Sequence, residues 1–388
     1  MNNSIINIVF NKSIKLFHII FICVALFPIY TEDGLSLNYS FLLIPFIFPN
    51  YKFNLSRNLI FILLIFFSIF TINFIFISIN TVHLIGRSII SFLLFLSIFS
   101  WAFFKFDKYL LQTVELSIVL FSVCYSIYTI ISVIYNIVFL NLIDIFLLKD
   151  IVGSNRVSFI LVSGYFILNS LDFKSKNLFS IIIIIGVFLT FSRAAIVTLI
   201  LTLILFNLNS KLRLIKYISI FIVIASLFIF AFHEQLYPFY EFFYERLFLR
   251  FTDSSYSLTS TTSSEGIRID TWKAMIEHIS SNFKSIMFGT GYLGPWILDN
   301  ISVSSSHNQF IDILFRTGII GISTIFLILI NASIYLKKTK NKWLKVLVVL
   351  VIYGFFHESF KETQGAFLLS IILMQYFNKP NKILKNNN

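Results

Sequence analysis

The sequence is poor in cysteine and in charge, and each shortage excludes a class of protein. Its two cysteines, Cys23 and Cys124, both lie in apolar stretches, so the sequence implies neither a disulfide framework nor a cysteine-based metal cluster. Charged residues make up only 12% of the chain and hydrophobic residues 57%, which excludes a soluble domain with an ordinary core. We find no internal repeat and no HExxH zinc motif, and we expect neither a metal nor a cofactor.

The charge that is present collects between long apolar stretches. The net charge is +12, and most of the excess lies in short loops, so membrane topology accounts for it without a nucleic-acid partner. Acidic loops at Glu32/Asp33 and Asp150 alternate with basic ones. The basic loops are Lys52/Arg57, Lys105/Lys108, Lys174/Lys176, Lys211/Arg213/Lys216, 337–345 and 379–385. The positive-inside rule places the basic loops and both termini in the cytoplasm.

The pattern predicts an all-α, polytopic membrane protein with about twelve transmembrane helices and one large periplasmic loop. We expect helices 1–9 in a membrane domain over 1–232, the loop over 233–306, and helices 10–12 with a cytoplasmic tail over 307–388. The predicted segments are 14–30, 35–49, 58–79, 86–104, 110–140, 156–171, 177–191, 194–208, 215–232, 307–336, 343–357 and 364–377. Within the loop, residues 265–283 read as an amphipathic helix with Ile269, Trp272, Ile276 and Ile279 on one face.

Arg193 is the most informative single residue. It lies between two uncharged stretches of about 15 residues, whose rise of roughly 22 Å is shorter than the hydrocarbon layer. The turn is therefore expected to be recessed on the outer side, where an arginine costs ~2.5–3.5 kcal/mol. Such a residue typically lines a polar cavity and binds an anion. The alternative is an arginine that only anchors a helix end.

Two motifs lie near the end of the predicted loop, and we reject one as a ligand site and keep the other as a candidate. Residues 289–294 read Gly-Thr-Gly-Tyr-Leu-Gly and formally match GxGxxG, but no strand precedes them, so we reject a dinucleotide site and assign the glycines to tight turns. His307 follows three serines, Ser304 to Ser306, which we expect to cap the next helix. A histidine there is usually structural, yet beside arginines it is a plausible base.

Other polar residues at outer helix ends are secondary candidates. The last outer connection, 357–362, is short and charged, and it is either a solvated turn or part of the site. We expect Arg87 and Arg316 to anchor or pack helices. The secondary site candidates are Arg156, Asn308, Glu358 and Lys361.

Four stretches together resemble the O-antigen polymerase/O-antigen ligase family of bacterial membrane glycosyltransferases. They are Phe191-Ser192-Arg193-Ala194, Arg268 four residues before Trp272, Gly289-Thr290-Gly291, and His307-Asn308 followed by Gly318 and Gly321. Each is short, but their order is similar to that of the family over about 150–377.

The resemblance implies glycan transfer from an undecaprenyl-diphosphate-linked oligosaccharide at the periplasmic face of the bacterial inner membrane. Carried over, Arg193 and Arg268 would bind the donor diphosphate, and His307 would be catalytic. The acceptor would be a lipid-linked repeat unit for a polymerase, which we favour, or lipid A-core for a ligase. The other partners that we expect are the lipid bilayer and, as a candidate, a chain-length regulator.

A flippase or transporter for the same lipid is the rival from another class. Transporters of this size typically carry a two-fold repeat and charges spread through several helices. Here the charges within apolar segments are few and gather at the predicted outer mouth, which favours an enzyme.

Overall fold

The computed structural model is helical wherever it describes the chain. It describes residues 16–27, 39–47, 52–53, 56–75, 85–105, 108–139, 154–172, 174–190, 192–207, 264–298, 306–360 and 362–378. Within these ranges β pairing is limited to an isolated antiparallel bridge between Phe53 and Phe104. The predicted segment 215–232 and the loop up to 263 lie outside the described residues.

Every predicted membrane segment that falls within the described residues is helical. Beyond a first helix over 16–26, the elements are η1 Tyr39–Leu43, α2 Ile44–Ile47, α3 Arg57–Ile75, α4 Ile85–Leu96, η3 Ser97–Phe103, α5 Lys108–Phe139, α7 Ser154–Asn169, α8 Lys176–Leu189, α9 Arg193–Asn207, α13 Ser264–Ser280, α14 Phe283–Phe288, η5 Gly294–Ile297, α15 Gln309–Lys338, α16 Trp343–Gly354 and α17 Thr363–Phe377. The apolar composition of many of these helices is typical of membrane segments.

Three of the described helices are long and apolar enough to cross a membrane. They are Arg57–Ile75, Lys108–Asn136 and Gln309–Lys338. The shorter apolar helices include α8 and α9, with 14 and 15 residues, as the stretches on each side of Arg193 predict. The described part of the chain is therefore all-helical with three candidate membrane spans, while the number of crossings and the side on which the loop lies stay predictions.

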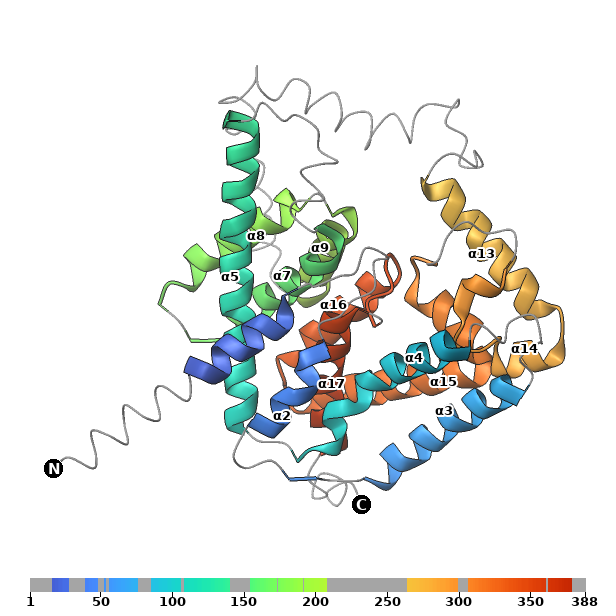
Figure 1. Cartoon of the computed structure of the whole chain (residues 1–388). Helices are drawn as coiled ribbons and strands as arrows, with labels where there is room; N and C mark the ends of the chain where they lie inside the picture. The colour runs from blue at the N-terminus through green and yellow to red at the C-terminus, as the bar shows by residue number, and fades with distance from the viewer. Residues whose placement is uncertain are drawn as a thin grey trace.

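The helices form two groups around a central set (Figure 1). On one side α5, α7, α8 and α9 pack together, and on the other α3 and α15 pack with the loop helices α13 and α14. In the centre α16 contacts α7, α9, α15 and α17. Small residues allow the close approaches, because a Cβ at Gly164 or Gly186 would collide with Ser122 or Ser126 of α5.

One buried carboxylate joins α5 to the α15–α16 connection. Glu115 is 2% exposed, and its Oε2 lies 2.6 Å from Lys342 Nζ. The indole Nε1 of Trp343 donates to Glu115 Oε1 at 2.8 Å. A charge removed from water needs such partners, so this predicted inner loop is held against the helix bundle rather than solvated.

Candidate functional site

The start of α15 is capped by Asn308 rather than by the serine cluster. The Asn308 side-chain oxygen accepts from Phe310 N at 3.0 Å and Ile311 N at 3.1 Å, and its Nδ2 donates to the carbonyl of Phe355 at 3.1 Å. The prediction of a serine cap is therefore wrong for Ser306, and Ser304 and Ser305 lie outside the described residues. The reason is that the Ser306 hydroxyl is used elsewhere.

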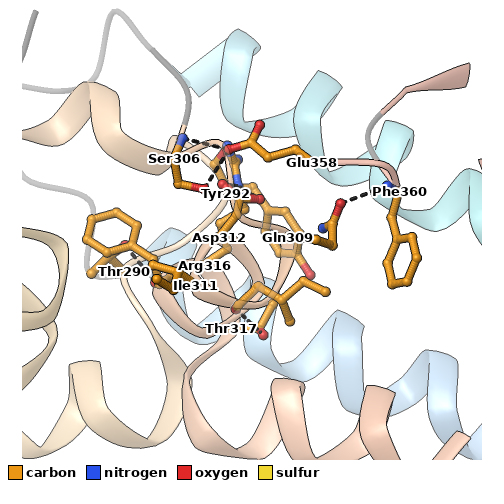
Figure 2. A network of polar contacts seen from close by, with 12 residues as sticks. Thr290, Tyr292, Ser306, Gln309, Ile311, Asp312, Arg316, Thr317, Glu358 and Phe360 are labelled. Carbon is orange, nitrogen blue, oxygen red and sulfur yellow. Dashed lines mark hydrogen bonds and ion pairs between the residues drawn. The ribbon is translucent and has the colours of Figure 1, made fainter. Parts of the chain in front are cut away.

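Ser306 is a junction between the loop helix, α15 and the turn after α16 (Figure 2). Its backbone nitrogen and its Oγ both lie 2.7 Å from Glu358 Oε1. The same Oγ lies 2.8 Å from a second acceptor, the carbonyl oxygen of Asn308. The carbonyl of Ser306 accepts from Trp272 Nε1 of α13 at 2.6 Å. Both backbone polar atoms of the residue before His307 are thus fixed.

His307 has an unusual backbone conformation between these two fixed neighbours. Its φ is 51°, a region that residues other than glycine rarely adopt. The side chain is half-buried, and its ring centroid lies 5.8 Å from that of His357. The His357 ring stacks in turn on Tyr353 at 5.7 Å. The structure therefore places a second histidine beside the predicted catalytic one.

Tyr353, near the end of α16, is where the predicted site segments meet. Its hydroxyl lies 3.4 Å from Ser158 Oγ of α7 and hydrogen-bonds the side chain of Ser192, the residue before Arg193. The charges of Glu362 and, to a smaller extent, Arg268 also act on this hydroxyl. Arg193 begins α9 and is exposed, whereas Arg268 on α13 is half-buried. We call Arg193, Arg268, His307, Tyr353 and His357 the mouth cluster.

The buried face of α13 differs from the predicted one. Thr271, Met275 and Ile279 are buried, while Ile276 is 48% exposed. Met275 and Ile279 pack with Phe315 of α15, and this contact rotates the helix from the face read in the sequence. Trp272 is only half-buried, which leaves its indole N–H at the edge facing Ser306.

Further along the chain from His307, α15 is interrupted, and the backbone of the loop donates hydrogen bonds to the carbonyls next to the interruption. Gly318 has φ 64° and ψ −169°, so the helical hydrogen bonds around it are interrupted. Thr290 N donates to Phe315 O at 2.8 Å, and Gly291 N donates to Arg316 O at 3.1 Å. A Cβ at Gly318 would collide with the backbone of Met287. We call residues 289–294 and 312–318 the clip.

Arg316 completes the clip from within. Its Nε lies 2.9 Å from both carboxylate oxygens of Asp312, and its Nη1 donates to the carbonyl of Tyr292 (Figure 2). Arg316 is 8% exposed and Asp312 1%. The guanidinium is therefore used inside the protein, as expected for a helix-packing charge.

A different histidine, His278 of α13, belongs with the clip. Its ring packs at 5.9 Å from that of Phe315. Burial, followed by the nearby charge of Lys284, lowers the pKa of His278, so its imidazole is neutral at pH 7. This residue contributes packing rather than charge.

The remaining candidates divide into placed and unplaced residues. Asn308 and Glu358 are buried at the junction. Arg156 lies in α7, but its side chain, like that of Arg87 in α4 and the whole of Lys361, is outside the described residues. Across the described part of the chain, no group of three or more His, Cys, Asp or Glu side chains is arranged to hold a metal ion.

The sequence reading missed two site residues. It gave no role to Tyr353, because a tyrosine near the end of an apolar helix carries no distinguishing pattern. It named His357 only as part of a charged turn, since nothing local links residues 50 positions apart.

Comparison with known families adds one decisive match. Residues 178–326 match the model of the O-antigen ligase family. This part of the chain is similar to that family. The match contains Arg193, Arg268, His307 and the whole clip, and it ends before Tyr353, His357 and Glu358. No curated protein matches the chain. The match supports a membrane enzyme of the O-antigen ligase/polymerase type.

Proposed function

We propose that the protein is a polysaccharide repeat-unit polymerase that moves a glycan from an undecaprenyl-diphosphate donor to a sugar hydroxyl. The observation that carries the proposal is that the segments bearing Arg193, Arg268 and His307, all within the matched range, come together around Tyr353 and His357. A diphosphate leaving group requires cations, and a sugar hydroxyl requires a proton acceptor. The cluster contains both.

The proposed reaction is a direct displacement. The acceptor oxygen forms a bond to the anomeric carbon as the bond from that carbon to the diphosphate oxygen breaks, which inverts the anomeric centre. The diphosphate leaves with the bonding electrons and is stabilised by Arg193 and Arg268 through bidentate hydrogen bonds. The acceptor proton passes to the imidazole of His307 and then to water. No metal ion is required in this scheme.

A ligase that transfers the glycan to lipid A-core is the second candidate, because the matched family is described as O-antigen ligase. The two differ only in the acceptor. The lipopolysaccharide pattern of a deletion strain separates them: core carrying one repeat unit indicates a polymerase, and bare core indicates a ligase or the rival flippase. An unchanged pattern would refute both.

The same proposal requires the site to face the periplasm from the inner membrane. The alternating loop charges support this orientation. Reporter fusions at Ser260 and Lys340 should report opposite compartments, and the same compartment for both would contradict the orientation. A chain-length regulator is the proposed protein partner, because polymerisation must stop at a defined length.

A further inference from the structure

The indole of Trp272 has a single hydrogen-bond donor, and this N–H donates to the main chain of the residue before His307. Nε1 donates to the carbonyl of Ser306, 34 positions later, at 2.6 Å. Ser306 is fully buried. A short, partly buried bond between segments so far apart in the chain fixes the distance between α13 and the residue before His307.

The other polar atoms around His307 are fixed from a different direction. Glu358 holds the N–H and Oγ of Ser306, and the Asn308 side chain is tied to Phe355. An unfavourable φ persists only where the surrounding structure determines it. The φ of 51° at His307 is therefore maintained by these ties, with Trp272 supplying the tie to α13.

Trp272 also lies one helical turn after Arg268. Met275, one turn further, anchors α13 on Phe315 of α15. We propose that Trp272 is a positioning residue, which holds His307 at a fixed place relative to Arg268 through the main chain of Ser306. The inference rests on the proposed function, because it takes His307 as the acting group.

The test is Trp272→Phe, which removes the N–H and keeps an aromatic ring. The chain offers a matched control in Trp101→Phe, since the indole N–H of Trp101 also donates to a main-chain carbonyl, that of Phe41, at 3.1 Å, on an element without site residues. Transfer is measured with purified, folded protein against varied donor. We expect kcat to fall on the order of ten- to hundredfold in Trp272→Phe with the donor KM nearly unchanged, because misplacement of a reacting group lowers the rate by such factors. The control should keep wild-type kcat.

Equal losses in the two variants, or a raised donor KM with normal kcat in Trp272→Phe, would overturn the inference. Should Trp272→Phe accumulate poorly, the benzothiophene analogue of tryptophan at position 272 removes the N–H without changing ring size, and the same comparison decides. His307→Ala is measured alongside. Normal activity there refutes the catalytic assignment itself, whereas an inactive His307→Ala with a normal Trp272→Phe refutes only the positioning role.

Discussion

Arg316 of the clip lies on α15, nine residues after His307 of the mouth cluster, and the two regions use arginine in opposite ways. In the clip Arg316 is buried, and its guanidinium is bonded to Asp312 and to the carbonyl of Tyr292. In the mouth cluster Arg193 is exposed and Arg268 half-buried. A buried charge must be satisfied by the protein, whereas an exposed one is also in contact with solvent. The comparison teaches that position in the fold, rather than residue type, separates packing arginines from candidate ligand-binding ones.

His307→Ala is expected to have the largest effect on the mouth side of this comparison. Transfer per folded molecule should fall by about 10²–10⁴-fold, the usual contribution of a general base. Donor binding and protein yield should stay near wild type. Turnover and donor affinity measured on purified protein check this. A loss of protein from the membrane with unchanged specific activity would show that His307 has a structural role and not a catalytic one.

Asp312→Ala should produce the opposite result in the clip. It leaves the Arg316 charge buried without its carboxylate, and breaking a buried pair typically costs about 3–5 kcal/mol. We expect a large drop in thermal stability and in folded yield. Specific activity of the surviving folded protein should be retained. A normal melting temperature combined with lost turnover would show that the clip takes part in catalysis.

Arg193→Lys tests whether geometry or charge alone matters at the mouth. A lysine keeps the charge but lacks the planar fork that binds phosphate oxygens in pairs. Hydrogen bonds to charged groups are worth about 1.5–3 kcal/mol, so we expect about a ten- to hundredfold loss in kcat/KM for the donor. Arg268→Ala should show a comparable loss. Retention of normal activity in both Arg193→Ala and Arg268→Ala, at normal protein levels, would refute diphosphate binding by these residues.

Asn308→Ala is the smallest and sharpest test, because the chain carries a matched cap. Asn282 caps α14 by accepting from Ser285 N at 2.8 Å, away from the mouth cluster. Loss of either cap should cost about 1 kcal/mol of stability. Only Asn308→Ala should also reduce turnover, by a few fold, since it loosens the backbone next to His307. Equal turnover in the two variants would show that the Asn308 cap does not influence the candidate site.

Local patterns predicted the helices well, because apolar runs such as those of α3 and α5 reflect burial in lipid or in the helix bundle. They predicted the face of α13 poorly. Its sequence offers two overlapping apolar stripes, and the packing of Met275 and Ile279 on Phe315 selects one of them.

The candidate site shows the same division between local and distant information. Arg193 and His307 stand out because their charge or position conflicts with a hydrophobic setting. Tyr353 does not stand out, since its role depends on Ser192 and Arg268, which come from two other parts of the chain, and on His357 in the turn that follows it. The choice of Asn308 over serine as the cap likewise depends on Glu358, more than 50 residues away in sequence.

The break at Gly318 bears on how the protein is made. Main-chain carbonyls without hydrogen bonds cost several kcal/mol each in lipid. Those of Phe315 and Arg316 find their donors in Thr290 and Gly291, which precede α15 in the chain and are therefore synthesised first. The donors are already present when the first part of α15 emerges. Insertion of this helix and docking of the loop are thus coupled, and α15 reaches its final form only together with a segment that was made before it.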